Sequence, residues 1–404
     1  MALDGQGARA DKRRLGWRPG AVRVAHVCTI DLSLRYLLGN QLQHLQRVGF
    51  DVIGISSPGP HVAWLEEHGI RHVPVPMQRA FTPLDDLRAV FDLARVMKRE
   101  KLTIVHTHNA KPGLLGQLAA RLAGVPIVVN TIHGFYFQDD TPLLKRRFYV
   151  LLEQVAASCS DDILSQSKED LETAVREHLC ARDDIEHLGN GIDVTRFEPA
   201  STDADGARAR ASLGFAADDL VVGFVGRLVE EKGVRELWAA LRELRKSFPR
   251  IKLLIVGETD SHKGDALTRD DAKAAGVGDL CVFTGWRDDL PGLYAAMDVC
   301  ALPSWREGFP RVPMEASAMG VPVVATDIRG CREAVEQGVN GILVPAKDAG
   351  ALARALEALL SSEESRRRLG EGGRRLARER FDERRIFATV ERHYRELLTT
   401  KGLA

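Results

Sequence analysis

The sequence predicts an α/β protein built from two doubly wound parallel-sheet domains in tandem. Short runs rich in β-branched residues alternate with longer stretches in which apolar residues recur at helical spacing. This alternation is typical of a parallel sheet covered by helices on both faces. It pauses once, over residues 197–219, where Pro, Ser, Asp and Gly cluster, and then begins again. A chain of 404 residues also suits two domains of about 200 residues each better than one core.

The first half of the chain contains the expected elements of one such domain. In chain order we expect a strand at 22–29, a helix at about 33–48, strands at 51–57 and 72–77, a helix at about 84–101, a strand at 102–108, a helix from about 113, a strand at 126–134, a helix at about 142–158, a strand at 162–167, a further helix and a strand at 185–191. Residues 1–20 are basic but lack an apolar core, so we expect a disordered extension and no signal peptide.

The second half repeats the order of strand, tight turn and helix. We expect strands at 220–228, 251–258, 281–285, 299–304, 322–327 and 341–345, with helices between them, and a mostly helical end from about 348. The boundaries predicted from this pattern are a first domain over 21–198, a linker over 199–219, a second domain over 220–380 and a C-terminal helix over 381–404. One apolar stripe along this last helix indicates that it packs back on the first domain.

Bulk composition excludes several classes of protein. Lys and Arg total 56, as do Asp and Glu, so a nucleic-acid partner is not expected. The six cysteines are scattered without a CxxC pair, which is typical of reduced thiols in a cytoplasmic protein. No apolar stretch reaches the roughly 20 residues that span a bilayer.

The stretch "FVGRLVEEKGV", residues 224–234, is a candidate anion site. Gly226 follows an apolar strand, Gly233 lies near the start of a helix, and the turn between them carries Arg227 and Lys232. Two cations at the carboxyl end of a strand, beside a helix N-terminus, favour binding of a phosphate. The alternative is an ordinary solvated loop between strand and helix.

The stretch "WREGFPRVPMEASAMG", residues 305–320, carries two carboxylates on either side of two prolines. Pro310 disfavours helix at the residue before it, and Pro313 is tolerated only in a first helical turn. Glu307 is therefore expected on a loop, and Glu315 early in a helix that begins near residue 311 or 312. Carboxylates that accept hydrogen bonds from hydroxyls, beside amides that hold phosphate, indicate a sugar nucleotide. The alternative is a plain helix start with a surface glutamate.

Three further positions in the first half carry polar groups at strand ends. His133 follows an apolar strand and precedes a glycine, on the side where parallel sheets bind ligands. Asn190 and Gly191 suit a turn with positive φ. His106 and His108 alternate along a strand, so we expect them to point to opposite faces. They lack a third ligand at metal spacing, so no metal site is expected.

Together these motifs resemble those of the retaining glycosyltransferases of the GT-B fold, family 4. The pair Glu307 and Glu315 matches the two glutamates separated by seven residues, and "AMGVPVVATDIRG", "GRLVEEKG" and "NGID…F" also match. The segments "HTHNAKPGLLGQLAARLAGVP", "TIHGF" and "SWREGFPRV" look most like the bacterial subgroup that builds capsule, exopolysaccharide and lipid-linked oligosaccharides. The resemblance implies two Rossmann-like domains facing a central cleft, with the acceptor bound by the first domain and the nucleotide sugar by the second.

The resemblance also implies roles for the nucleotide side of the donor. Arg227 and Lys232, in the turn after Gly226, would bind the diphosphate and offset the charge of the leaving nucleotide. Glu315 would hold the ribose hydroxyls, and Asn190 would lie close to the donor. No metal and no cofactor would be needed, because the two cations take the place of a metal.

On the sugar side, Glu307 would face the donor sugar, with Gly308 and Phe309 presenting backbone amides. His133 would reach the sugar from the first domain. The donor implied is a UDP-linked hexose or N-acetylhexosamine. Retention would follow front-face attack within an ion pair, or an enzyme nucleophile, for which Glu307 is the natural candidate.

The acceptor implied is a glycan or a polyprenyl-linked glycan. Many relatives carry a glycine-glycine loop after the first strand, whereas this chain has Ser33, Leu34 and Arg35 there. Residues 143–155 mix basic and aromatic residues, a composition compatible with peripheral contact with the inner membrane or with a lipid-linked acceptor. The alternative for that segment is an amphipathic helix with a basic face. Two alternative functions remain: a sugar-nucleotide epimerase on the same fold, and a catalytically silent scaffold.

Overall fold

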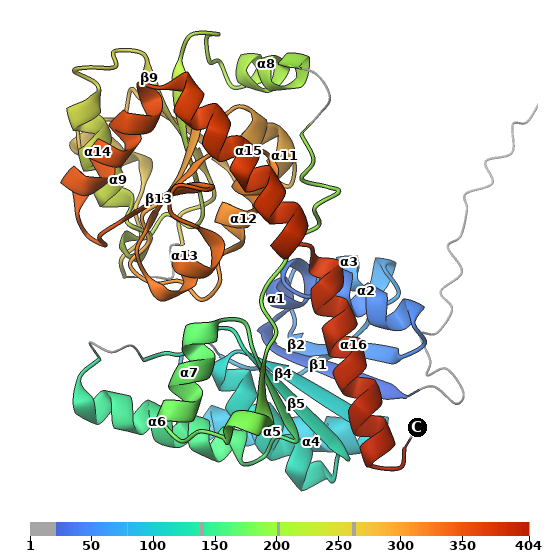
Figure 1. The fold of residues 1–404 in the computed structure, drawn as a ribbon. Coiled ribbons are helices and arrows are strands. Elements are labelled where there is room, and N and C mark those ends of the chain that lie inside the picture. The colour runs from blue at the N-terminus through green and yellow to red at the C-terminus, as the bar shows by residue number, and fades with distance from the viewer. Residues whose placement is uncertain (1–21, 79, 138–140, 200–202, 261–263, 404) are drawn as a thin grey trace, which may run out of the picture. The chain divides into compact units, whose positions relative to one another are not determined.

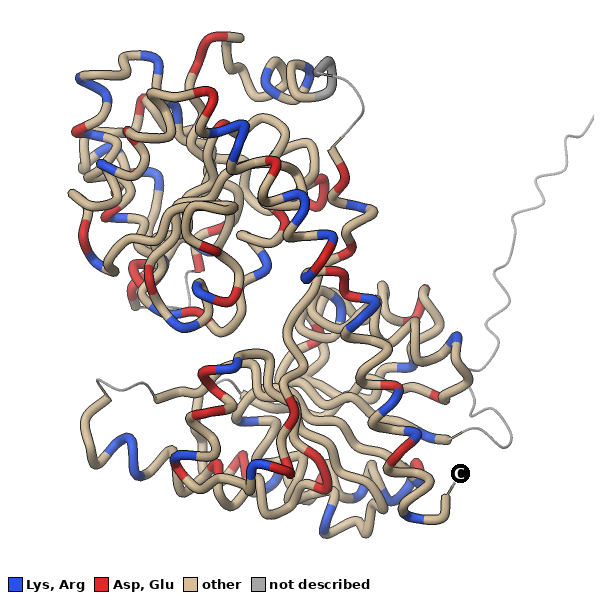
Figure 2. Tube along the Cα trace, in the orientation of Figure 1, with Lys and Arg blue, Asp and Glu red and all other residues tan. Residues whose placement is uncertain are grey.

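The computed structural model describes residues 22–78, 80–137, 141–199, 203–260 and 264–403 (Figure 1). The predicted extension, residues 1–20, lies outside the described residues. The chain forms two compact units. The first comprises Met1–Thr131, Asp140–Ile163 and Glu391–Ala404, and the second comprises Ile132–Asp139 and Leu164–Val390. Figure 2 shows Lys and Arg interspersed with Asp and Glu along the chain, in keeping with their equal totals of 56.

The first sheet has seven strands in the order β3-β2-β1-β4-β5-β6-β7. Their bounds are β1 Arg23–Ile30, β2 Asp51–Ser57, β3 Arg71–Pro74, β4 Ile104–His108, β5 Ile127–Ile132, β6 Asp162–Ser165 and β7 Ile185–His187. The pairings of β1 with β2 and β4, of β2 with β3 and of β4 with β5 are parallel. The strands after β1 therefore extend the sheet first on one side, as β2 and β3, and then on the other side, from β4 to β7.

The second sheet repeats this topology with six strands in the order β10-β9-β8-β11-β12-β13. Their bounds are β8 Leu220–Val225, β9 Ile251–Val256, β10 Cys281–Gly285, β11 Val299–Leu302, β12 Val323–Thr326 and β13 Gly341–Val344. All five neighbouring pairs are parallel. The predicted fold class, two doubly wound parallel sheets, is confirmed.

Helices follow most strands, as expected of parallel sheets whose crossovers are helical. In the first half they are α1 Asp31–Tyr36, α2 Gly39–Arg47, α3 Val62–Glu67, α4 Pro83–Glu100, α5 Ala110–Ala123, α6 Leu143–Ala157, α7 Lys168–Arg176 and the 3₁₀ turn η1 Arg182–Asp184. The rest are α8 Asp203–Ser212, the 3₁₀ turn η2 Glu230–Lys232, α9 Val234–Leu244, α10 Arg269–Ala274, α11 Leu290–Ala295, α12 Arg311–Ala318, α13 Arg329–Ala334, α14 Ala349–Leu360, α15 Glu363–Arg380 and α16 Glu383–Thr400.

Two apolar cores enclose the second sheet. One contains Leu237 of α9 and Leu356 of α14, and the other contains Met314 of α12 and Leu376 of α15. The inner strands β8, β9, β11 and β12 are mostly buried, which explains why they read as continuous apolar runs. Helices thus pack on both faces of the second sheet, and this packing positions the loops at the ends of its strands.

The structure differs from the sequence-based expectation in two segments. The helix expected at about 33–48 is two helices, α1 and α2, separated at Leu37 and Leu38. Gly39 begins α2, where a Cβ would lie 2.8 Å from the Trp64 ring, so the second helix packs closely on α3. The segment 199–219, expected to be a linker, contains the helix α8. In the described residues, no helix is both long and apolar enough to cross a membrane.

Candidate active site

The candidate site lies at the point where the strand order of the second sheet reverses, between β8 and β11. Ligands of open α/β sheets bind beyond the carboxyl ends of the strands at such a point. The loop after β8 carries the predicted cationic turn, and the loop after β11 carries Glu307. The two motifs, which lie about 80 residues apart in the chain, are thus neighbours in the fold.

The two loops touch backbone to backbone at Gly233. This residue has φ +70°, and a Cβ there would lie 1.9 Å from the carbonyl oxygen of Pro303. No side chain fits that gap, and the left-handed conformation itself favours glycine. Gly226 is held from the other side, because a Cβ on Gly257 would lie 2.0 Å from its carbonyl oxygen.

Both predicted cations are paired with carboxylates. Lys232 Nζ lies 2.6 Å from Glu307 Oε1, which also accepts a hydrogen bond from Ser304 Oγ at 2.7 Å. Arg227 Nη1 lies 2.7 Å from Asp260 Oδ2 and its Nη2 lies 3.4 Å from a Glu231 oxygen. The structure therefore brings Lys232 directly to Glu307. Sequence reasoning missed Asp260, since nothing in its local pattern marks it.

Glu307 and Glu315 lie on the predicted elements. Glu307 is on the loop, and α12 begins at Arg311 after Pro310. The side chain of Asn190 donates to the carbonyl oxygen of Phe309 at 2.8 Å and so fixes the end of this loop. The prediction of a positive φ at Asn190 or Gly191 is wrong, because the positive φ lies at Gly189 (+76°). The Asn190 side chain hydrogen-bonds the Phe309 carbonyl oxygen and accepts from the amide of Gly191.

Gly308 is packed between two other segments of the second unit. A Cβ on Gly308 would lie 2.1 Å from the carbonyl oxygen of His133, and a Cβ on Gly330 would lie 1.8 Å from the carbonyl oxygen of Gly308. The predicted site residue His133 thus meets the Glu307 loop through its backbone. Burial lowers the pKa of the His133 imidazole to about 4, against a hydrogen bond with Gln166, so this ring is neutral near pH 7.

Glu315 is buried in α12. Its Oε2 accepts a hydrogen bond from the Tyr294 hydroxyl at 2.9 Å, and Arg311 Nε lies 3.8 Å from Oε1. Burial raises the pKa of the Glu315 carboxyl, and the Arg311 guanidinium opposes that shift. Tyr294 comes from α11 and could not be predicted as a partner from the sequence.

The prediction for the histidines of β4 is wrong. Residues two apart in a strand point to the same face, and the His106 and His108 rings stack with centroids 4.3 Å apart. A third imidazole, His26, comes from β1, so the three could together hold a metal ion. Their nitrogens are already bonded: His26 Nδ1 to His108 Nε2 at 2.9 Å, and His106 to Tyr394 and Thr131 at 2.6 and 2.7 Å.

We interpret this histidine group as a hydrogen-bonded network. Burial lowers the pKa of His26 to about 3, so that ring is neutral. A divalent cation would displace at least one of these bonds and would bring two positive charges into a buried group of three neutral ligands. Three imidazoles are nevertheless a ligand set that zinc can use, so the expectation that a third ligand is missing is wrong.

Comparison with known proteins gives consistent matches over most of the chain. A model described as "Glycosyltransferase Family 4" matches residues 37–196, and one described as "Glycosyl transferases group 1" matches 205–376. The chain is 30% identical, over 83% of its length and 87% of the relative's, to the Escherichia coli UDP-Gal:alpha-D-GlcNAc-diphosphoundecaprenol alpha-1,3-galactosyltransferase. It is 27% identical to the Staphylococcus aureus capsular polysaccharide biosynthesis glycosyltransferase CapM, over 93% and 97% of the two chains.

Solved structures show the same fold. The Anabaena protein HepE in complex with UDP-glucose has a TM-score of 0.78 at 22% identity, covering 93% of this chain and 99% of that one. A sucrose-phosphate synthase from Thermosynechococcus elongatus has a TM-score of 0.78 at 22% identity, covering 94% and 100%. At these identities the likeness concerns the fold alone.

Proposed function

Because the chain belongs to glycosyltransferase family 4, we propose that it transfers a hexose or N-acetylhexosamine from a UDP-sugar, with retention of configuration, to a glycan or lipid-linked glycan. The product would enter a bacterial surface polysaccharide. The relatives named above support this assignment, since one is a UDP-galactose transferase acting on a lipid-linked sugar and the other belongs to capsule synthesis.

The observation that carries the proposal is the contact between Lys232 and Glu307 at 2.6 Å. It places a cation and a carboxylate together at the reversal point of the sheet, between two loops held by glycine packing. A diphosphate is a stronger partner for Lys232 than one carboxylate is, because it carries more charge. Donor binding would therefore take Lys232 from Glu307 and free that carboxylate for the sugar hydroxyls.

Arg227 and Lys232 would stabilise the charge that develops on the leaving UDP. Preorganised cations at a leaving group are a large source of rate enhancement and require no metal. Arg227 would exchange Asp260 and Glu231 for the phosphates. Gly226, just before it, would let the backbone approach the diphosphate. Glu315 would hold the ribose hydroxyls and Asn190 would keep the loop in place.

At the sugar, Glu307 and the amides of Gly308 and Phe309 would contact the hydroxyls. His133 would contribute a neutral imidazole, which hydrogen-bonds a hydroxyl without repelling an oxocarbenium-like transition state. Retention would occur by front-face attack, with the departing phosphate accepting the acceptor's proton, or through Glu307 as a nucleophile. Both routes begin with cleavage of the bond between the anomeric carbon and the phosphate oxygen.

The acceptor side of the proposal rests on α6. Besides Leu143 at its start, its exposed large apolar residues form one helical stripe: Leu144, Phe148, Leu151 and Val155. Exposed Lys145 and Arg147 lie in its first turns. A helix with an exposed apolar stripe and basic residues suits the surface of an anionic membrane, where a polyprenyl-linked acceptor would be embedded. We include peripheral membrane contact in the proposal on that ground.

Incubation with radiolabelled UDP-galactose, UDP-glucose and UDP-N-acetylglucosamine, with and without a bacterial lipid extract, tests the function. Transfer of label to lipid or glycan is the expected result. Conversion of the sugar without an acceptor would instead identify an epimerase, and binding without any reaction would identify a silent scaffold. Either of those results would overturn the proposal.

A further inference from the structure

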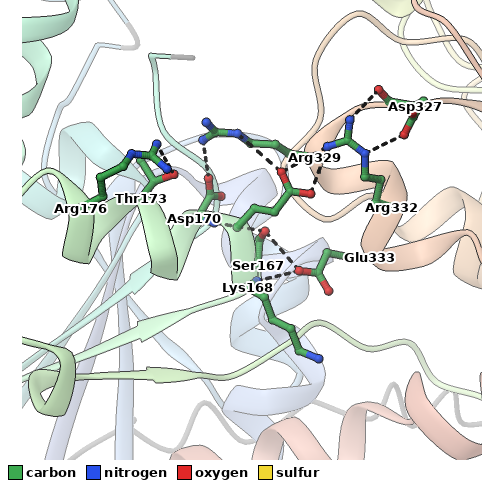
Figure 3. Close-up of polar contacts among 10 residues, drawn as sticks. Ser167, Lys168, Asp170, Thr173, Arg176, Asp327, Arg329, Arg332 and Glu333 are labelled. Atoms are coloured by element: carbon green, nitrogen blue, oxygen red, sulfur yellow. Dashed lines mark hydrogen bonds and ion pairs between the residues drawn. The ribbon is translucent and has the colours of Figure 1, made fainter. Parts of the chain in front are cut away.

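Helices α7 and α13 face each other with opposite charges (Figure 3). Arg329 Nη1 of α13 lies 3.4 Å from Asp170 Oδ1 of α7, and Arg332 Nη1 lies 3.1 Å from Glu169 Oε1. In return, Glu333 of α13 accepts hydrogen bonds at the N-terminus of α7, from the amide of residue 168 at 2.6 Å and from Ser167 Oγ at 3.3 Å. A carboxylate at that end of a helix is favourable, because it meets free amides and the positive end of the helix dipole.

The Arg329–Asp170 pair lies beside the two segments that hold Gly308. Gly330, next to Arg329, touches the Gly308 carbonyl oxygen, and Gly308 touches the backbone of His133 and Gly134. A Cβ on Gly134 would lie 4.0 Å from Asp170 Oδ2. The pair thus joins α7 to the segment of Gly330 that packs on Gly308, close to the turn at Gly134.

Three ion pairs join these helices, because Arg329 Nε also lies 3.9 Å from Glu169 Oε2, and they differ in burial. The side chains of Arg329 and Asp170 are 17% and 6% exposed, whereas those of Arg332 and Glu169 are 45% and 35% exposed. Exposed pairs contribute little to a structure, and breaking a buried pair leaves an uncompensated charge. Arg332 therefore provides a matched control on the same helix.

We propose that Arg329 and Asp170 are positioning residues for sugar transfer, which hold α13 so that Gly308 stays against His133 and the amides of Gly308 and Phe309 meet the donor sugar. This inference rests on the proposed function. The nucleotide would be held elsewhere, by the cationic turn and by Glu315. Loss of the pair should therefore displace the sugar and leave the affinity for UDP unchanged.

The pair also has a characteristic pH range. Burial raises the pKa of Asp170 to about 6; Arg329 opposes that shift, and Glu169 and Glu333 add to it. As the pH falls through about 6, Asp170 becomes neutral and Arg329 loses the nearer and more buried of two carboxylate partners, Glu169 being the other at 3.9 Å. Turnover should therefore decline on the acid side of that value.

The test compares Arg329→Gln, Arg329→Lys, Asp170→Asn and the control Arg332→Gln. Calorimetry measures the affinity for UDP, and steady-state kinetics measure kcat and KM for UDP-galactose, UDP-glucose and UDP-N-acetylglucosamine. Displacement of a reacting group by about 1 Å can cost roughly 100-fold in rate. We expect Arg329→Gln to lower kcat by roughly 10- to 100-fold and to keep a UDP affinity within about twofold of the wild type. Arg329→Lys should recover part of the lost kcat. Arg332→Gln should change neither kcat nor the UDP affinity. Asp170→Asn should lower kcat and abolish the acid limb near pH 6.

Different results would overturn the role of Arg329 and the proposed function. If the wild type is active while Arg329→Gln and Arg332→Gln behave alike, this inference alone is overturned. The same holds if the wild type is active while Asp170→Asn keeps the wild-type decline in turnover at acid pH. A wild type that neither binds UDP nor turns over any of the three donors overturns the proposed function, and this inference with it. Thermal unfolding of each variant separates loss of positioning from loss of folding.

Discussion

Replacement of Lys232 by alanine should separate stability from activity in a way that few other substitutions would. Lys232 Nζ lies 2.6 Å from Glu307 Oε1, and the two side chains are only 18% and 12% exposed. The substitution leaves Glu307 with the Ser304 hydroxyl as its hydrogen-bond donor at 2.7 Å. An ionised group that loses its partner at such burial costs about 1–3 kcal/mol of unfolding free energy.

Expressed as free energy, the loss in kcat should exceed the loss in unfolding free energy, and it should have another origin. Lys232 is proposed to stabilise the leaving diphosphate, and removal of one such preorganised donor typically costs about 100- to 1,000-fold in kcat, or about 3–4 kcal/mol. The double variant Lys232→Ala with Glu307→Gln removes the unpaired charge. It should regain most of the lost stability, since contacting residues are not additive, and should regain none of the activity.

Urea unfolding and steady-state turnover of the two single variants and the double variant provide the assay. Turnover of Lys232→Ala above about a tenth of the wild-type value would refute the assigned role, since a transition-state contact of this kind is worth far more. A double variant as unstable as the sum of the single variants would refute the coupling of Lys232 with Glu307.

Three other predictions address the packing, the pH dependence and the acceptor side. Gly308→Ala should impair folding or turnover, because its Cβ would lie 2.1 Å from the His133 carbonyl oxygen. The control Gly292→Ala, with nothing within 4 Å of its Cβ, should behave as the wild type. Equal thermal unfolding and equal kcat of the two variants would contradict close packing at Gly308. The pKa of His133 is lowered from 6.5 to about 4, so between these pH values only the unfolded state takes up the proton. The unfolding free energy should therefore fall as the pH drops from 6.5 to about 4. In urea titrations His133→Gln should show a shallower fall, and an unchanged slope would contradict this role of His133. Phe148→Glu on α6 should weaken flotation with anionic vesicles, and Leu122→Glu, at an even more exposed site on α5, should not; parallel losses would indicate non-specific adhesion.

Local physical rules were enough to place part of the site. Two prolines determine where a helix can begin, so Glu307 on a loop and a helix from Arg311 followed from the sequence and are confirmed. The alternation of strand and helix likewise predicted two parallel sheets. Both inferences depend on neighbours within a few residues.

Contacts between distant residues could not be predicted in this way. Arg329 and Asp170 lie 159 positions apart, and Tyr294 reaches Glu315 from another helix. His26 joins His106 because β1 pairs with β4, which the sequence does not reveal. The expectation for His106 and His108 is wrong for another reason: side chains two residues apart in a strand share a face.

The anomeric configuration of the product tests the central claim most directly. The wild-type protein, supplied with an α-linked UDP-sugar and an N-acetylglucosamine-diphospholipid acceptor, should release UDP and form an α-glycoside, read by the anomeric proton coupling in the nuclear magnetic resonance spectrum. A β-linked product would contradict retention, and absence of any transferred sugar from all three UDP donors would contradict the assignment as a UDP-sugar-dependent transferase.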